Sequence, residues 1–564
     1  MVVLPHPLGP KRVRNSFFFI FRERLSKIVS FPYDLVIPFN SIILLSLVIL
    51  STSIFINLQK REDVQSTFLE EVSNDIIPKP LSYVKNNGKF ILSKESSIYI
   101  KGKNKEETEE IRIVAEFLRE KLISPTGYEL KIVEGDNPPS GNIYLTTLGG
   151  NEAEGNEGYN LITTKEKIEI IAYKPEGISR GVQSLRQLLP PDIEKNSLVS
   201  NVEWSVPASN IKDKPEYSYR GLMIDVARHF FSVDEIKRQI DHAALYKINR
   251  VHLHLSDDQG WRLEIKQYPD LTKIGGSTEV GGGKGGYYTQ EQFKDIVKYA
   301  RDRYVEIIPE FDMPGHSNAA LASYGFLNPD GKRKPLYTGT EIGFSSFMTH
   351  SEETYKFLDN VFKEVAAISP SKYFHIGGDE ALSTKKENYD YFVGRVAKMV
   401  EALGKTPIGW DPIDTSPEIN SSVILQNWKD SNEAARKKGM KMIISIASKA
   451  YLDMKYNKDT PYGLDWAGYI PIETAYNWDP TDYAPKDLVL GVESPLWTEN
   501  ILNQQQMDFM IYPRLLGYGE IGWTPKKDRN WNEYKIRLEK QGERLKNLGI
   551  NYYRDSSIWP SERK

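Results

Sequence analysis

The 564-residue sequence contains no cysteine. This absence excludes disulfide bonds, thiolate metal sites, a cysteine nucleophile and a lipid-modified N-terminal cysteine. A charge excess of one sign is also lacking, since 73 Lys and Arg residues face 76 Asp and Glu residues and the formal net charge is −3. Because proteins that bind nucleic acid need a basic surface, we expect no nucleic acid partner. The length allows more than one domain and a large core.

One long apolar run is present near the N-terminus. Residues 35–58 contain no charged residue, and about 20 apolar residues are enough to span a bilayer. Basic residues predominate in residues 1–34 and acidic residues in residues 59–75, which predicts an N-terminus inside the cell and an exported body. We therefore expect a basic N-terminal region, a single-pass membrane anchor at 35–58 and a linker at 59–75. A cleaved signal peptide, which would leave a secreted protein, is the alternative.

Residues 76–210 combine the patterns of short strands and helices. Strand-like segments occur at residues 89–92, 97–100, 143–147 and 167–172, and helical spacing of apolar residues occurs at 106–122 and 180–189. The second helix is followed by Pro190 and Pro191, which end it. This region is predicted to be a small α/β domain with an accessory role, because its polar residues do not converge on one place.

Between residues 211 and 545, short apolar runs that end in polar or aromatic residues alternate with helical stretches. The eight runs are residues 221–228, 250–258, 305–316, 373–380, 406–411, 423–428, 441–448 and 488–499, and helical spacing occurs at 233–246, 290–303, 353–367 and 389–403. This alternation predicts a (β/α)8 TIM barrel, with its site at the C-terminal ends of the strands. Residues 546–564 are assigned to a C-terminal tail.

A doubly wound parallel sheet is the alternative fold. It would place a glycine-rich phosphate turn after its first strand, where this sequence has Val226-Ala227-Arg228-His229. A glycine cluster does occur at residues 275–286, but it follows Tyr268-Pro269, and Lys284 precedes glycine where a phosphate loop has Ser or Thr. We therefore interpret the cluster as a mobile loop near the barrel mouth.

His252 and His254 lie on one face of a predicted strand, and their spacing to Asp257 would allow a metal site. Most histidines in strands are structural, so we expect no metal and no cofactor.

Asp379 and Glu380 are neighbouring carboxylates at the end of an apolar run. Alternate residues of a strand point to opposite faces, so neighbours can reach one site only where the strand ends, and Gly377 and Gly378 supply that break. One acid that donates a proton beside another that stabilises charge suits catalysis at a strand tip. A surface acidic turn is the alternative interpretation.

Several ordered motifs together resemble glycoside hydrolase family 20, the exo-acting β-N-acetylhexosaminidases. They are residues 219–231 (YRGLMIDVARHFF), 252–262 (HLHLSDDQGWR), 309–316 (PEFDMPGH) and 375–380 (HIGGDE), with later pieces at 409–411, 426–428, 451–453 and 493–499. The resemblance covers residues 78–554 and implies removal of terminal N-acetylhexosamine from oligosaccharides or glycoconjugates. It also implies a retaining mechanism in which the 2-acetamido group of the sugar attacks its own anomeric carbon.

The resemblance assigns roles to the residues that would act on the reacting atoms. Glu380 would be the general acid and later the base, a task that needs a pKa raised by an apolar surround. Asp379 would accept the acetamide N–H and stay ionised, stabilising the charge of the closing ring. Tyr451 would donate its hydroxyl to the acetamido oxygen. The apolar surround would come from Trp410, Trp428 and Trp497, although each could instead pack in the core.

Other residues would bind the sugar or support the acids. Arg228, Asp453 and Glu499 would hold the ring hydroxyls of a non-reducing end through charge-assisted hydrogen bonds, with an ion pair inside the barrel as the alternative for Arg228. Asp257 and His316 would support the catalytic acids from behind. Two other functions stay open, namely a tethered sugar-binding protein without turnover and a same-fold enzyme that releases disaccharides or transfers the sugar. The natural glycan, the preference between N-acetylglucosamine and N-acetylgalactosamine, and the oligomeric state are not specified.

Overall fold

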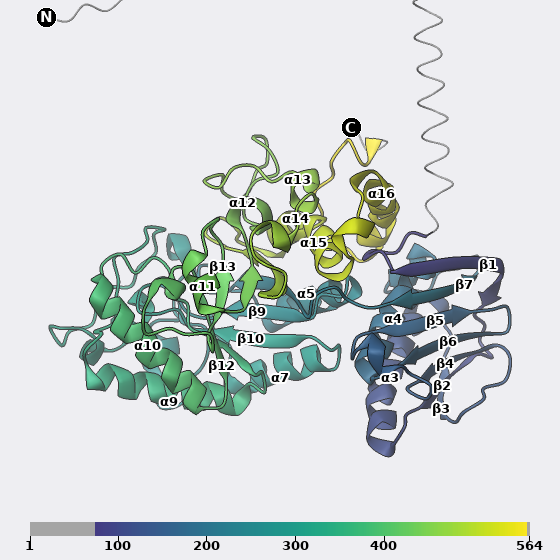
Figure 1. Ribbon diagram of the computed structural model, residues 1–564, viewed down its shortest axis with the longest axis horizontal. Helices are drawn as coiled ribbons and strands as arrows, with labels where there is room; N and C mark the ends of the chain where they lie inside the picture. The colour runs from purple at the N-terminus through teal and green to yellow at the C-terminus, as the bar shows by residue number, and fades with distance from the viewer. Residues whose placement is uncertain (1–73, 561–564) are drawn as a thin grey trace, which may run out of the picture. The chain divides into compact units, whose positions relative to one another are not determined.

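The computed structural model describes residues 74–560 (Figure 1). The predicted anchor at 35–58, the basic region before it and nearly all of the linker lie outside these residues. Within the described part of the chain, no helix is both long enough and apolar enough to cross a membrane.

The first domain is a seven-stranded mixed sheet with two helices, which agrees with the predicted small α/β domain but has more strands than the four predicted. The strands are β1 (Ser82–Ile91), β2 (Ser97–Lys101), β3 (Lys131–Glu134), β4 (Asn142–Thr146), β5 (Tyr159–Thr163), β6 (Lys167–Ala172) and β7 (Ser205–Asp213), in the spatial order β1-β7-β5-β6-β4-β2-β3. The helices are α3 (Lys105–Thr126), which Asn104 caps at its N-terminus by accepting from the Glu107 N–H, and α4 (Pro175–Leu188). Both helices pack their apolar residues against the sheet, which gives this domain its own core.

The second domain is a closed barrel of eight parallel strands, which confirms the predicted TIM barrel. Its strands are β8 (Tyr219–Asp225), β9 (Arg250–His254), β10 (Glu306–Glu310), β11 (Tyr373–His375), β12 (Thr406–Trp410), β13 (Ile424–Asn427), β14 (Met442–Ile444) and β15 (Val489–Leu496). The predicted helices appear as α5 (Val233–Leu245), α7 (Gln290–Arg301), α9 (Glu352–Ile368) and α10 (Lys386–Ala402). The chain adds α11 (Glu433–Lys438), α12 (Ala447–Ala450), α13 (Ile472–Tyr476), α14 (Gln504–Ile511), α15 (Arg514–Trp523) and α16 (Trp531–Asn547).

Several barrel strands are shorter than the runs that predicted them. β10 ends at Glu310 and β11 at His375, so residues 311–316 and 376–380 are loops beyond the strand ends. Because these loops all leave the same end of a parallel barrel, their polar residues meet at its mouth.

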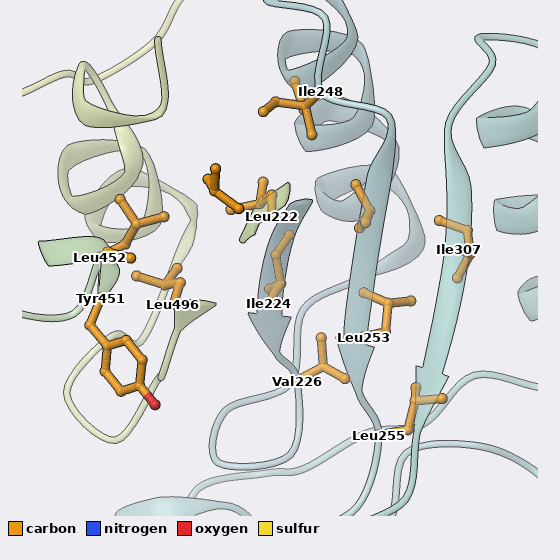
Figure 2. Packing of buried hydrophobic residues seen from close by; sticks show 14 of the residues in the cluster. Leu222, Ile224, Val226, Ile248, Leu253, Leu255, Ile307, Tyr451, Leu452 and Leu496 are labelled. Carbon is orange, nitrogen blue, oxygen red and sulfur yellow. The ribbon is translucent and has the colours of Figure 1, made fainter. Parts of the chain in front are cut away.

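The barrel strands alternate between an outer and an inner face. Leu222 and Ile224 of β8 belong, with Leu253 of β9, to the outer core beneath the surrounding helices (Figure 2). His252 and His254 alternate with these residues and point into the barrel. The lower interior is filled by an apolar layer, consisting of Tyr219, Ile308, Tyr373, Ile408, Ile424 and Ile443.

Buried ion pairs join the small domain to the barrel. Lys247 donates to Asp213 at the end of β7 over 2.8 Å. Arg220 of β8 donates to Glu157 over 3.1 Å, and both side chains are buried. Arg544 of α16 donates to Glu194 over 2.8 Å. Each pair takes one charge from each domain, and Glu157 and Glu194 also pair with Arg180 and Arg186 of the small domain.

The glycine cluster at residues 275–286 wraps around one guanidinium group. Arg262, fully buried, donates to the backbone carbonyl oxygens of Val226, Ala227, Gly276, Thr278 and Gly286. The cluster also reaches the mouth, since the Val280 N–H donates to the Arg228 carbonyl. The loop lies near the barrel mouth, as predicted. These hydrogen bonds hold it in place, so they do not support the expected mobility.

Candidate active site

A cavity of about 400 Å³ opens at the C-terminal mouth of the barrel. Eight of the eleven predicted site residues line it: Arg228, Asp379, Glu380, Trp428, Tyr451, Asp453, Trp497 and Glu499. Asp257, His316 and Trp410 lie outside the cavity wall. The remaining lining residues, which sequence reasoning missed, are Thr340, Glu341, Ile342, Leu464 and Trp466. A cavity of this size falls within the range that binds small ligands, about 300–1,000 Å³.

The backbone after β11 turns sharply to present both acids. Gly377 and Gly378 have φ angles of 64° and 109°, a region in which residues with a side chain are strained. A Cβ atom on Gly377 would lie 1.8 Å from Asp312 Oδ1. Glu380 itself has a φ of 45°, which is uncommon for a residue other than glycine and is typical of functional sites. The predicted break at the two glycines is therefore present.

His316 connects the acids to Asp257. Its Nε2 lies 3.5 Å from Glu380 Oε2 and 3.9 Å from Asp379 Oδ2, while its Nδ1 lies 3.1 Å from Asp257 Oδ1. Burial alone would lower the pKa of His316, but the charge of Asp257 outweighs burial and raises this pKa well above its ordinary value. A cationic imidazole therefore faces both catalytic candidates, while the supporting role of Asp257 and His316 stays a prediction.

Asp312 approaches Asp379 from the loop after β10. It accepts a hydrogen bond of 3.0 Å from the Gly378 N–H. Burial and the charge of Asp379 raise the pKa of Asp312 well above its ordinary value, which favours the protonated form of Asp312. Burial also raises the pKa of Asp379, whereas His316 and the hydrogen bond from Asp312 act in the opposite direction. The ionised Asp379 that the mechanism needs thus depends on these two neighbours.

Aromatic rings form the walls of the cavity. Tyr451 follows α12, and its ring stacks with Trp428 at 6.4 Å between centroids and lies 6.3 Å from Trp497. Trp466 stands perpendicular to Trp428 and Tyr451 and is 57% exposed, so it forms the rim. Trp410 lies one layer deeper, with its ring 5.6 Å from Trp497. Burial and the charge of Asp379 raise the pKa of Tyr451 well above its ordinary value, so its hydroxyl remains a donor.

Arg228 organises the acids on the other side of the cavity. It donates to Asp225 over 3.2 Å, lies 2.9 Å from Asp257 Oδ2 and 4.0 Å from Glu499 Oε1, and packs over the Trp497 ring at 5.0 Å. Arg228 therefore forms an ion pair inside the barrel, which was the alternative role considered for it, and it also lines the cavity.

Asp453 and Glu499 present unpaired oxygen atoms to the cavity. Among the described residues, neither oxygen of Asp453 nor Oε2 of Glu499 has a hydrogen-bond partner, although these atoms are buried. Burial raises the pKa of both carboxyls, and the charge of Glu499 adds to the rise at Asp453. Buried polar atoms in proteins are nearly always hydrogen-bonded, so these oxygens fit the hydroxyl groups of a ligand.

The histidines considered as metal ligands already face carboxylates. His254 Nδ1 lies 2.6 Å from Glu310 Oε2 and its Nε2 lies 2.8 Å from Asp257 Oδ2. His252 Nδ1 lies 2.9 Å from Glu493 Oε1. A histidine that donates from both nitrogens has no lone pair for a metal, so the donor set favours the structural interpretation.

Models of one enzyme family match both domains of this chain. The models "Glycosyl hydrolase family 20, domain 2" and "Glycosyl hydrolase family 20, catalytic domain" match residues 73–214 and 217–526. A β-N-acetylhexosaminidase of Cellulomonas fimi is 37% identical over 441 residues, which cover 77% of this chain and 87% of that protein.

Two solved structures are also similar. The β-N-acetylhexosaminidase of Streptomyces coelicolor A3(2) has a TM-score of 0.81 and 44% identity, with 86% of this chain and 98% of that chain covered. A mutant β-hexosaminidase of Streptomyces plicatus in complex with product (GlcNAc) has a TM-score of 0.80 and 44% identity, with 86% and 97% covered. From the motifs, the barrel and these matches, the chain belongs to glycosyl hydrolase family 20.

Proposed function

We propose that the protein hydrolyses terminal, non-reducing β-linked N-acetylhexosamine from oligosaccharides and glycoconjugates, with retention of configuration. The observation that carries this proposal is the presence of Asp379, Glu380 and Tyr451 in one aromatic-walled cavity, with the two acids adjacent in the sequence. A conventional retaining glycosidase instead holds its acid and its nucleophile across the scissile bond, about 5–5.5 Å apart. Adjacent acids fit a reaction in which the sugar supplies the nucleophile.

In the first step, the carbonyl oxygen of the 2-acetamido group attacks the anomeric carbon. The bond from that carbon to the glycosidic oxygen breaks, and Glu380 transfers its proton to the departing oxygen. The product is a bicyclic oxazolinium ion. Asp379 accepts the acetamide N–H and stabilises the positive charge, while Tyr451 donates to the acetamido oxygen and orients it. Tethering the nucleophile to the reacting carbon replaces a bimolecular attack with an intramolecular one.

In the second step, Glu380 acts as a base. Its carboxylate accepts a proton from a water molecule, whose oxygen attacks the anomeric carbon from the face that the leaving group vacated. The ring opens and the acetamido group is restored. Two inversions at one carbon give net retention.

The rest of the cavity selects the terminal sugar. The unpaired oxygens of Asp453 and Glu499 accept from ring hydroxyls, and Arg228 beside them donates. Trp428 and Trp497 cover the apolar faces of the sugar. The exposed Trp466 stands where the next sugar unit would leave the cavity.

The test is turnover of 4-nitrophenyl N-acetyl-β-glucosaminide by the full-length protein in detergent. We expect Glu380→Gln to lose at least about 100-fold in kcat, because it removes the base that activates water in the second step, and general acid–base catalysis contributes about 10²–10⁴-fold. Glu433→Gln, which changes an exposed acid on α11, is the matched control and should retain full activity. The corresponding 4-nitrophenyl β-glucoside lacks the acetamido group and should not be cleaved.

Wild-type turnover by Glu380→Gln would contradict the acid assignment. Equal cleavage of the β-glucoside would contradict attack by the acetamido group. Product analysis on oligosaccharides that end in N-acetylglucosamine or N-acetylgalactosamine separates removal of single sugars from disaccharide release and from transfer.

We also propose that residues 35–58 anchor the protein in a membrane with the catalytic domain outside the cytoplasm. The proposal rests on the uncharged apolar run and the basic residues before it. Full-length protein should stay with membranes through an alkaline carbonate wash, and deletion of 35–58 should release it. Recovery of a mature protein that begins after residue 58 would instead indicate a cleaved signal peptide.

A further inference from the structure

Carboxylates and histidines alternate through the barrel interior behind the catalytic acids. In order towards the mouth they are Glu493, His252, Glu310, His254, Asp257 and His316, which we call the ladder. Successive nitrogen–oxygen distances are 2.9, 3.0, 2.6, 2.8 and 3.1 Å. His316 then lies 3.5 Å from Glu380. Every member of the ladder is buried.

The alternation fixes which members are charged. His254 lies between Glu310 and Asp257, so it can donate to both only as an imidazolium, with a hydrogen on each nitrogen. His252 also lies between two carboxylates, but only its Nδ1 makes a hydrogen bond, to Glu493, while its Nε2 lies 3.0 Å from Glu310 without hydrogen-bond geometry. Although burial lowers the pKa of these histidines, the charges of the flanking acids raise both pKa values above the ordinary range, to about 9 for His252. The ladder is therefore a row of alternating charges.

Glu310 is the centre of this row. Its Oε2 lies near both His252 and His254, and its Oε1 accepts a hydrogen bond of 2.7 Å from the Trp410 Nε1–H. A carboxylate held by this many donors remains ionised, and burial, which raises its pKa, is outweighed by His254 and the other histidines, so the pKa lies well below its ordinary value.

The lower end of the ladder is closed. Glu493 accepts from the Tyr219 hydroxyl over 2.5 Å and from Gln426 over 2.6 Å. The apolar layer of the lower barrel lies beneath. Glu493 at that end is fully buried, whereas the Glu380 side chain at the other end is 29% exposed. The electrostatic effect of the ladder is directed at the catalytic acids.

We propose that Glu310, His252 and Glu493 are positioning residues that act through His254, Asp257 and His316 to stabilise Glu380 after it gives up its proton. A cationic His316 favours the carboxylate that proton transfer leaves behind. His316 remains a cation while Asp257 is an anion, and both Arg228 and His254 stabilise that anion; His254 makes its contribution only while Glu310 keeps it doubly protonated. The inference rests on the proposed function, because it assumes that Glu380 is the acid.

Glu310→Gln removes the central charge with little change in shape. An amide oxygen can still accept from His254 Nδ1, but His254 no longer lies between two anions. Without its second proton, His254 would turn a lone pair towards Asp257 Oδ2, now 2.8 Å away, and Asp257 would lose a donor. Glu493→Gln makes the same change one histidine further from the site, so its effect should be smaller.

The readout is the dependence of kcat on the leaving group, measured with full-length protein in detergent. A 4-nitrophenyl leaving group needs little protonation, whereas the second sugar of a β-1,4-linked N-acetylglucosamine disaccharide cannot depart without it. We expect Glu310→Gln to lower kcat for the disaccharide about ten-fold more than for the nitrophenyl substrate, with KM changed less than about two-fold. Glu493→Gln should also lower kcat more for the disaccharide than for the nitrophenyl substrate, but by a smaller factor.

Two controls separate this role from damage to the fold. Glu520→Gln removes an equally buried carboxylate, one that pairs with Arg537, and should lower both activities by the same factor. Glu380→Gln should show the leaving-group bias more strongly than any ladder variant.

Equal losses on both substrates for Glu310→Gln and Glu493→Gln, or no loss, would overturn the role of the ladder. If Glu310→Gln does not fold, Glu493→Gln decides the question alone. A wild-type protein that cleaves neither substrate, or Glu380→Gln without bias, would instead contradict the proposed function.

Discussion

Substitution of Gly377 by alanine tests how the backbone presents the two acids. The added Cβ would lie 1.8 Å from Asp312 Oδ1 and 2.7 Å from Asp312 Cα, closer than non-bonded atoms approach. The φ angle of 64° adds about 1–2 kcal/mol of strain for a residue with a side chain. Asp312 must therefore move, and its buried hydrogen bond with the Gly378 N–H would be lost at a further cost of about 1–3 kcal/mol.

Gly404 provides a matched control for the backbone strain. Its φ angle is 72°, but no heavy atom of the described residues lies within 4 Å of an added Cβ. Gly404→Ala should therefore cost only the strain of about 1–2 kcal/mol and should retain wild-type kcat. The difference between the two variants isolates the contact with Asp312.

We expect Gly377→Ala to unfold at a lower temperature than Gly404→Ala and to lose at least about 100-fold in kcat, since a displacement of about 1 Å at a reacting group can cost that much. Thermal unfolding by circular dichroism and turnover of the nitrophenyl substrate measure the two effects. Equal unfolding temperatures and equal kcat values for both variants would refute the argument that Asp312 and Gly377 position the acids.

Three further predictions concern other residues. Tyr451→Phe removes the hydroxyl donor from the acetamido oxygen, so kcat should fall about 10- to 100-fold with a smaller change in KM, and unchanged kcat would exclude that role. Glu499→Gln should raise KM about ten-fold, because an amide binds a sugar hydroxyl more weakly than a carboxylate does, and inhibition by free N-acetylglucosamine should weaken in parallel. Burial, with a contribution from Arg238, lowers the pKa of His242 from 6.5 to about 3, so the unfolded chain binds a proton that the folded protein does not between these pH values. Stability should fall by about 1.4 kcal/mol per pH unit as the pH falls through this window. Denaturant unfolding of His242→Gln should lack this component, and identical pH profiles would contradict it.

The barrel could be predicted from the sequence because its strands are buried on both faces. Each reads as a short apolar run, and the polar residues that follow it mark the mouth of the barrel. In the small domain, β3, β5 and β7 escaped prediction; β3 has four residues, none of them buried, and β7 alternates with polar residues and contains Pro207.

Helix α15 could not be predicted from local helix propensity. It contains Gly517, Gly519 and Gly522, which disfavour helices. A Cβ on Gly519 would lie 2.6 Å from the Tyr246 carbonyl oxygen, and one on Gly522 would lie 2.5 Å from Arg220 Cγ. Tertiary packing thus requires glycine where local propensity argues against a helix.

The site was predictable where its residues fall in compact motifs at strand ends, as Asp379 and Glu380 do. Trp466 was missed because it lies in a long loop with no periodic pattern. The ladder was missed because its contacts join strands that are far apart in the sequence, such as His252 and Glu493. Only the closed barrel brings those side chains together.

The ion pairs between the two domains have a consequence for protein engineering. A barrel excised without the small domain would lose the carboxylates of Glu157 and Asp213, which pair with Arg220 and Lys247, and would lose the apolar core in which Trp523 packs. The lost pairs and the newly exposed apolar surface are a large cost against the small net stability of most folded proteins. The smallest portable catalyst is therefore the two-domain unit, and grafts or fusions should be made outside it.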